Sequence, residues 1–391
     1  MERIQRTVIR GLLAAALVAV APIAGTAAGA AAGGGQLQVG WATVDITPEL
    51  SKERQTAVAG LLIPRYTSEV VSRLAATALA IESVGGDGVK EQAVMVSCDL
   101  PGLAFHFDER PSPLLQVRER LRARLPDLDG RKLFFMATHA HSTPPFDENQ
   151  YAFVPGKGML RPSEYLEFLL QKLCAVVETA WTTRRSGGCT WGLGHAVVGQ
   201  NRRVVYPDGR AVMGGWTKNP DFDHVEGPDD HGVELLFFWN PERRLTGVLI
   251  NVACPSQVDS QALFISSDFW DGVRRELRRH PDFAEAAILP QLGAAGDQWP
   301  TRHYVREKAE VIMQQRHGLT RTQEKGRRIA NAVLDVYPYV KDGIVSDPTF
   351  RHRVEPVRLP YRIITAPEAA DMRQQLDRFK TDVDNPLRPV R

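Results

Sequence analysis

The chain has 391 residues, of which 43% are hydrophobic and 24% are charged, and its formal net charge is +2. This length allows one large α/β domain or two smaller ones, and the composition excludes a disordered or collagen-like protein. The cysteines match neither a CxxC zinc knuckle nor a dense disulfide framework. Cys174 and Cys189 could pair across a turn, whereas buried free thiols are expected at Cys98 and Cys254, because each ends an apolar run.

The first 35 residues have the pattern of a secretory signal. Arginines in MERIQRTVIR precede a short apolar run, GLLAAALVAVAPIAG, which opens into the small residues TAAGAAAGGG. Pro22 interrupts the run, and no later stretch approaches the ~20 apolar residues that a membrane-spanning helix needs. We therefore expect cleavage near residues 27–32, export to a periplasm or out of the cell, and no transmembrane anchor after cleavage.

Removal of residues 1–35 takes away three Arg and one Glu, which leaves residues 36–391 with no formal net charge. No run of Lys and Arg there suggests a groove for phosphates, so nucleic acid is not an expected partner. The expected partner is a small-molecule, lipid or glycan substrate.

The rest of the chain alternates between strand and helix patterns. Strands are predicted over 37–48, 73–84, 91–102, 132–142, 187–198, 232–239, 244–257, 286–297 and 351–363. Helices are predicted over 113–127, 163–185, 266–280, 320–337 and 366–382, and the longest stretch without periodicity is 201–231. This order predicts an α/β fold, with a single large domain over 36–391 and a mixed, largely buried β-sheet flanked by helices.

The ends of these strands carry the residues that are suited to chemistry. The segments SCDLPG, ATHAHSTPP, NVACPSQ and GAAGDQWP each follow a strand, and ligands of open α/β sheets bind outside the carboxyl ends of the strands. Within ATHAHSTPP, His139 and His141 could be a metal ligand and an acid/base group, because imidazole serves both roles. Two hydrogen-bonded loop histidines are the alternative.

Other candidates follow later strands. Asn201 and Arg202 could bind substrate, and Arg202 or the neighbouring Arg203 could clamp a carboxylate or stabilise an oxyanion; a solvated turn is the alternative. The acidic segment 226–231 could be a metal-binding loop or a polar turn before a strand.

Two further segments add candidates of the same kind. Cys254 could bind zinc as a thiolate, and Gln257 and Asp297 could contact a polar group of a substrate. Asp268 is either a catalytic carboxylate or the N-cap of the helix that follows it.

Taken in order, the blocks VGWATVDITP, CDLPG, THAHSTPP, GQNRRV, VACPSQV with ISSDFWDGVRREL, and LPQLGAAGDQWP resemble the neutral/alkaline (non-lysosomal) ceramidase family. The resemblance implies a secreted zinc amidase in which a metal-activated water hydrolyses the amide bond of ceramide. It implies that His139 is a zinc ligand, that His141 assists catalysis, and that Arg202 polarises the carbonyl or stabilises the oxyanion.

The sequence also departs from the pattern of that family. Cys254 aligns with the second zinc histidine, and Trp299 stands where the family has a serine important for activity. The Glu and Tyr ligands come from later blocks that do not occur before Arg391. The third ligand would then come from the set His141, His231, Glu234, Asp268 and Asp297, among which the sequence does not choose.

Three interpretations stay open at this point. The chain is a ceramidase-like zinc hydrolase that is truncated or has a remodelled site, or it is a glycan-active hydrolase or uronate lyase on the same scaffold, with His141 as acid or base and an arginine on the carboxylate. The third is a non-catalytic exported binding protein that has lost the metal.

Overall fold

The computed structural model describes residues 36–61, 65–85, 88–103, 111–148, 156, 158–300 and 304–381. The expected signal segment, residues 1–35, lies outside these ranges. Among the helices of the described ranges, none has both the length and the hydrophobicity needed to cross a bilayer.

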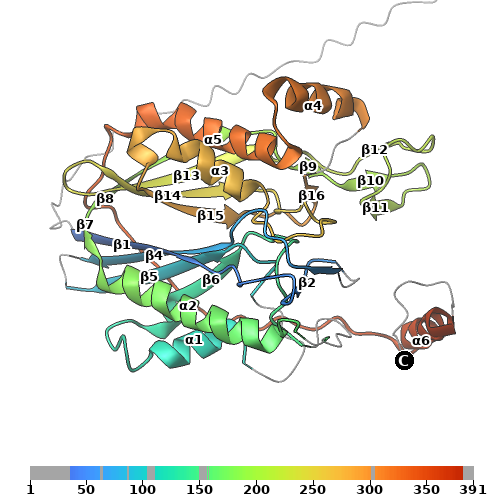
Figure 1. Cartoon of the computed structure of the whole chain (residues 1–391), viewed down its shortest axis with the longest axis horizontal. Helices are drawn as coiled ribbons and strands as arrows, with labels where there is room; N and C mark the ends of the chain where they lie inside the picture. The colour runs from blue at the N-terminus through green and yellow to red at the C-terminus, as the bar shows by residue number, and fades with distance from the viewer. Residues whose placement is uncertain are drawn as a thin grey trace, which may run out of the picture. The chain divides into compact units, whose positions relative to one another are not determined.

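The first half of the fold is a five-stranded mixed sheet in the order β6-β5-β4-β1-β7 (Figure 1). Its strands are β1 (Gln36–Asp45), β4 (Ala75–Val84), β5 (Lys90–Cys98), β6 (Leu133–Ala137) and β7 (Arg185–Ser186). All neighbours are antiparallel except β5 and β6. Helices α1 (Pro113–Leu121) and α2 (Pro162–Thr182) pack on one face, where apolar residues of β4 and β5 meet the buried stripe of α2.

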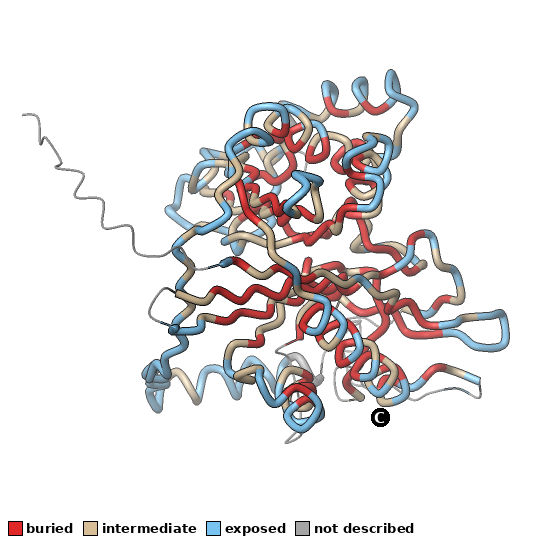
Figure 2. Tube along the Cα trace, turned by 90° about the vertical axis from the view of Figure 1, so that its left-hand side faces the viewer, coloured by how far each residue is buried: buried red, intermediate tan, exposed pale blue. Residues whose placement is uncertain are grey.

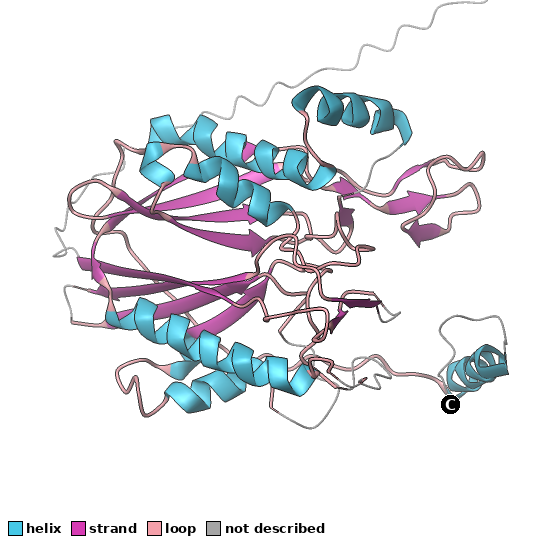
Figure 3. Cartoon of the chain, in the orientation of Figure 1, coloured by secondary structure: helices cyan, strands magenta, loops and turns pink. Residues whose placement is uncertain are grey.

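The second half is a four-stranded sheet in the order β15-β14-β13-β8. Its strands are β8 (Gly188–His195), β13 (Gly232–Trp239), β14 (Leu245–Val252) and β15 (Ala287–Leu292), and only the β14–β15 pair is parallel. Helices α3 (Phe269–Arg278) and α5 (Arg321–Val340) cover its outer face (Figure 3).

The two sheets pack face to face between the two helix layers. Leu37 and Leu79 of the first sheet meet Phe238, Leu249 and Leu289 of the second in a shared apolar cluster. Figure 2 shows that buried residues run through the middle of the molecule, in the strands and on parts of the helices that cover them. The expected α/β class with mixed, buried strands is confirmed, but the strands form two sheets rather than one, because each sheet is apolar on both faces and one face must be covered by the other sheet.

The other elements of the described ranges are short strands, two 3-10 helices and the helices α4 and α6. The segment 201–231, expected to be irregular, contains a three-stranded sheet in the order β11-β10-β12. The remaining elements are β2 (Thr56–Val58), β3 (Arg65–Thr67), η1 (Gly130–Lys132), β9 (Gln200–Asn201), β10 (Arg203–Val205), β11 (Ala211–Met213), β12 (His224–Val225), η2 (Pro281–Phe283), β16 (Gln298–Trp299), α4 (Tyr304–His317) and α6 (Ala366–Thr381).

One expectation about an individual segment is wrong, and one possibility left open by the sequence is not realised. Residues 351–363 belong to no sheet, because the segment leaves the body of the protein after His352 and no strand of the described chain pairs with it. Cys174 and Cys189 do not form a disulfide; all four cysteines are free and buried, Cys174 on α2 and Cys189 on β8.

Candidate functional site

The strand ends selected from the sequence are joined by backbone hydrogen bonds. Thr138 N donates to Cys98 O over 2.9 Å, and Ser256 N donates to Thr138 O over 3.1 Å, which links the ends of β5, β6 and β14. Gly293 N donates to Val252 O over 3.0 Å and adds the end of β15. Because the two sheets present these ends on the same side, the four segments form one cluster of loops.

His139 and His141 lie at the centre of this cluster, with ring centroids 4.7 Å apart. His139 has a left-handed backbone conformation, with φ of 61°, which is uncommon for a residue other than glycine and often marks a functional position. Its Nδ1 lies 2.5 Å from Pro101 O, which can only accept, so Nδ1 carries the proton and the neutral ring has a bare Nε2. This Nε2 lies 3.3 Å from His141 Nε2.

The amide nitrogen of Gln257 lies 2.8 Å from His141 Nε2. With the amide donating, His141 Nε2 carries no proton, and its single in-plane lone pair is directed to Gln257. A proton or cation placed between the two rings would therefore replace Gln257 as the partner of His141 Nε2. Gln257, predicted to contact a polar group of a substrate, thus lies against His141.

The backbone of His141 is held by an arginine that the sequence did not indicate. Arg65 donates to His141 O over 3.1 Å and also to Ala59 O and Ala262 O. Burial, followed by the charges of His139, Arg65 and Arg202, lowers the pKa of His141 to about 3. His141 is therefore neutral near pH 7, and the positive charges of Arg65 and Arg202 favour a ligand with a partly negative oxygen at this position.

Asn201 is the last residue of β9, and Arg202 follows it. Arg202 N donates to Asp297 O over 2.8 Å, and its guanidinium donates to Gly296 O over 2.8 and 3.2 Å. Asn201 Nδ2 donates to Asp297 Oδ2 over 2.8 Å. Asp297 and Asn201 thus fix each other, while Arg202 lies near enough to His141 to affect its pKa. The neighbouring Arg203 instead pairs with the exposed Glu226.

Asp268 is the N-cap of α3, as one of the two interpretations expected. Its buried carboxyl accepts from Phe269 N over 2.8 Å and from Asp259 N over 2.7 Å, and its φ of 56° is again in the left-handed region. Burial, and then the negative charge of Asp259, raises the pKa of Asp268 to about 7. Asp268 makes no hydrogen bond to the histidines in the described structure. It instead fixes the loop that carries Gln257.

Cys254 points away from the histidines. Its side chain belongs to the apolar cluster beneath α3 and α5, and its Sγ lies 3.6 Å from Pro255 O. Burial raises the pKa of this thiol strongly, which disfavours the thiolate that zinc requires. The structure thus pairs His139 with His141 and does not pair it with Cys254.

The two histidines meet part of what zinc needs. Two nitrogen ligands on a tetrahedral zinc ion lie about 3.4 Å apart at a Zn–N distance of about 2.1 Å, close to the 3.3 Å between the two Nε2 atoms. A catalytic site needs a third protein ligand, however. Over the described ranges, no group of three or more His, Cys, Asp or Glu side chains is arranged to hold a metal ion. The described residues therefore do not form a complete zinc site.

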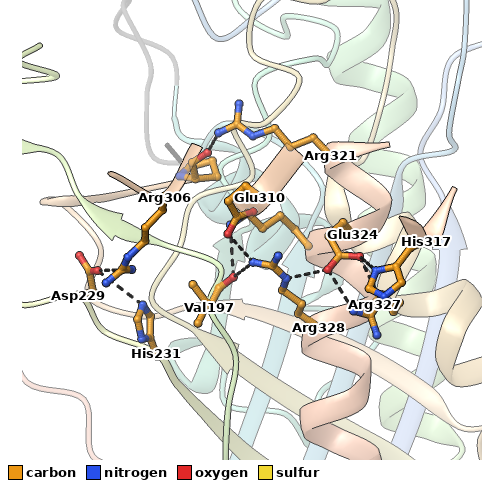
Figure 4. A network of polar contacts seen from close by, with 12 residues as sticks. Val197, Asp229, His231, Arg306, Glu310, His317, Arg321, Glu324, Arg327 and Arg328 are labelled. Atoms are coloured by element: carbon orange, nitrogen blue, oxygen red, sulfur yellow. Dashed lines mark hydrogen bonds and ion pairs between the residues drawn. The ribbon is translucent and has the colours of Figure 1, made fainter. Parts of the chain in front are cut away.

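The acidic segment 226–231 takes part in a different arrangement. Asp229 accepts from Asn201 N over 2.8 Å and from Arg306 of α4 over 3.1 Å, with His231 Nε2 at 3.8 Å (Figure 4). Glu234 on β13 accepts from Asn251. Within the described ranges, neither His231 nor Glu234 joins the histidine pair in a metal-binding group, so these two sequence candidates for a third ligand do not complete the site.

A buried ionic network on α5 supports the segment that leads to Asn201. Lys325 and Arg328 both donate to Val197 O, over 3.3 and 3.0 Å, and Arg328 also pairs with Glu310 of α4 and Glu324 of α5 (Figure 4). Periodicity placed Lys325 and Arg328 on a helix, but no sequence signal indicated that their charged ends meet the carbonyl of Val197, which lies 128 and 131 residues away, respectively.

The sequence matches no protein-family model and no curated protein. Solved structures match in fold. The neutral ceramidase from Pseudomonas aeruginosa superposes with a TM-score of 0.56 and 19% identity, over 78% of this chain and 45% of that chain. A ceramidase complexed with C2 gives a TM-score of 0.54 and 18% identity, over 78% of this chain and 44% of its own. The chain thus spans less than half of the length of these ceramidases, and its fold is ceramidase-like.

Proposed function

We propose that this chain is a hydrolase that cleaves the amide bond of an N-acylated lipid of the ceramide type. One observation carries the proposal: the Nε2 atoms of His139 and His141 lie 3.3 Å apart at the strand ends of a ceramidase-like fold. The positive charge of Arg202 acts on His141 and lowers its pKa. The signal pattern of residues 1–35 further supports an exported protein.

The roles of the side chains follow from their positions. A water oxygen adds to the carbonyl carbon of the amide, and Arg202 stabilises the negative charge that develops on the carbonyl oxygen. The water proton passes to an imidazole nitrogen and then to the leaving nitrogen, so that a carboxylic acid and an amine are released.

Zinc is proposed as a cofactor on the basis of the resemblance, with His139 as the ligand whose Nε2 is best placed. The ion would supply a more acidic water. Because the described residues provide two imidazoles and no third ligand, zinc binding and ceramide hydrolysis are tested in separate experiments.

The central test is hydrolysis of a fluorescent short-chain ceramide by the purified full chain. We expect amine release that falls by about 100-fold or more in His141→Gln and His139→Ala, the range typical of losing a proton-transfer group. His195→Ala is the matched control, since His195 is exposed on β8. Absence of turnover in the wild type, with binding of the ceramide retained, would instead identify a binding protein.

Metal analysis forms the second test. Near-stoichiometric zinc that is lost in His139→Ala and kept in Cys254→Ser would agree with the orientation of the two side chains. Zinc lost in Cys254→Ser without loss of folding would show that the thiol turns toward the histidines. Cleavage of uronate-containing oligosaccharides, with ceramide left intact, would replace the amidase proposal by the glycan alternative.

A further inference from the structure

The segment after His352 has a strand pattern but no strand partner. Up to His352 the chain is anchored to the body: Val345 forms a β-bridge with Cys189, and the ring of His352 lies 5.3 Å from that of Phe134. Beyond this point, over residues 353–364, the described structure contains no backbone–backbone hydrogen bond. Figure 3 shows this stretch as a loop that leads away to α6.

The side chains of this stretch alternate between apolar and polar. Val357, Leu359, Tyr361 and Ile363 are 75, 80, 97 and 85% exposed. They occupy every second position, so in an extended backbone they lie on one face. Arg358 and Arg362 lie on the opposite face. Large apolar side chains in a contiguous exposed row mark a surface that another molecule covers.

The prolines of the stretch distinguish its two backbone edges. In a strand, the N–H groups of alternate residues point to opposite edges. Pro356 and Pro360 occupy even-numbered positions, so one edge lacks donors at both. The other edge carries the N–H groups of the exposed apolar residues at 357, 359, 361 and 363. The stretch is therefore suited to pair along one edge only.

The stretch has an excess of positive charge, which favours a partner with acidic side chains. Residues 351–365 contain four arginines and one glutamate. Arg362 pairs with Glu368 of α6, and Arg353 pairs with Glu355, whereas Arg358 makes no ion pair within the described chain. Both ion pairs are largely exposed to solvent, so a partner carboxylate can replace them at little cost.

A second copy of the chain is a poorer partner. In an antiparallel self-pair along the open edge, Val357 would face Ile363 and Leu359 would face Tyr361, which is favourable. The same register places Arg358 of one copy opposite Arg362 of the other, and like charges in directly opposed positions are destabilising.

We propose that residues 353–364 are a docking strand that pairs, along the edge carrying the N–H groups of the exposed apolar residues, with an edge strand of a separate polypeptide in which apolar and acidic residues alternate. The apolar side chains of the partner cover the row from Val357 to Ile363, and its carboxylates face Arg358 and Arg362. Addition of a strand to an edge is a common mode of peptide recognition. This proposal does not depend on the hydrolase function.

The test uses the full chain and a blocked peptide, about nine residues long, in which glutamate alternates with valine. In the free protein, the amides of the open edge should exchange with deuterium rapidly. With the peptide bound, their exchange should slow by about tenfold or more, because strand pairing protects them. Slow exchange in the free, monomeric protein would overturn the proposal, since the stretch would already be paired within its own chain.

Neighbouring isoleucines give a matched pair of variants. Ile363→Pro removes a donor from the open edge and should weaken peptide binding, followed by fluorescence anisotropy, by about tenfold or more. Ile364→Pro removes a donor from the edge that prolines already interrupt, and should leave binding within about twofold. Equal losses in both variants would contradict pairing along one edge. Circular dichroism checks that both variants keep their fold.

The charge requirement is tested by reversing the charges of the peptide and of the protein. The wild type should bind the glutamate peptide and not a lysine–valine peptide, and the double variant Arg358→Glu with Arg362→Glu should reverse this preference. Three results would overturn the proposal: binding to neither peptide, dimerisation through this stretch in light scattering, or binding to phosphatidylcholine vesicles in place of the peptide.

Discussion

Gly60 lies so close to His141 that a Cβ atom at position 60 would fall 2.5 Å from the Cα and Cβ atoms of the histidine. Gly60 also has a φ of 107°, a backbone conformation that residues other than glycine rarely adopt. The backbone that carries the central histidine therefore packs against a position where only glycine fits.

We expect Gly60→Ala to displace His141 and to remove most of the hydrolytic activity, with a loss of about 2 kcal/mol in the free energy of unfolding from overpacking and strain. Gly209→Ala is the control, because Gly209 has a φ of 81° but, among the described residues, a Cβ at position 209 would meet no atom within 4 Å. Urea unfolding and ceramide hydrolysis measure the two effects. Full activity in Gly60→Ala would show that this contact does not position the histidine.

A second prediction concerns Asp268, whose pKa is raised from 3.8 to about 7 in the folded chain. Between these values the folded protein retains a proton that the unfolded chain has lost. The free energy of unfolding should therefore fall as the pH rises from about 4 to about 7. Asn at position 268 cannot ionise, so the free energy of unfolding of Asp268→Asn should not show this fall with pH. Urea midpoints of the two proteins, compared across this pH range, measure the difference.

Asp268→Ala tests the same side chain as a cap. It leaves Phe269 N and the N–H of Asp259 without their acceptor, and we expect a loss of about 2 kcal/mol. The loop that carries Gln257 should loosen, so hydrolysis should fall more in Asp268→Ala than in Asp268→Asn. Equal activity in the two variants would argue against a positioning role for the cap.

A third prediction concerns the buried Glu324. Burial alone would raise its pKa, but hydrogen bonds from Arg327, His317 and Arg328 outweigh burial and lower the pKa to about 2. Its contribution to stability is thus present above about pH 4.5 and is lost as the pH falls toward 2. Glu324→Gln removes the buried carboxylate from the half-buried Arg327 and Arg328 and should cost about 3 kcal/mol at pH 7.

Urea unfolding at pH 7 and pH 3 checks this prediction, because the difference between wild type and Glu324→Gln should shrink at the lower pH. Glu119→Gln breaks an exposed ion pair with Arg122 on α1 and should change stability by no more than about 0.5 kcal/mol. A pH-independent difference for Glu324→Gln would contradict the assigned pKa.

The fourth prediction concerns Lys325, a fully buried side chain whose pKa burial lowers from 10.5 to about 8. Between these values the unfolded chain holds a proton that the folded chain has lost, so the free energy of unfolding should rise with pH in this window. In Lys325→Met that rise should disappear.

At pH 7, Lys325→Met should be at least as stable as the wild type, because Val197 O and Glu310 both keep Arg328 as a partner. Thermal unfolding at pH 7 and pH 9.5 provides the measurement. A loss of stability larger than about 1 kcal/mol at pH 7 would show that the bond from Lys325 to Val197 O outweighs the cost of the buried charge.

Local sequence patterns determined most of the secondary structure. Alternating apolar residues predicted β1, short apolar runs predicted the other main strands of both sheets, and helical periodicity predicted α1, α2, α3, α5 and α6. These patterns are set by neighbours in the sequence. Residues 351–363 show their limit, because the alternation is present but a strand also needs an edge to pair with.

The sequence by itself also predicted a site at these strand ends, with His139, His141, Gln257 and Arg202 among its residues. Only the tertiary structure decided that His139 faces His141, that Cys254 turns into the core beneath α3 and α5, and that Arg65 holds the backbone at His141. Side-chain direction after a strand end depends on packing against segments far away in the sequence, and no local period encodes those contacts.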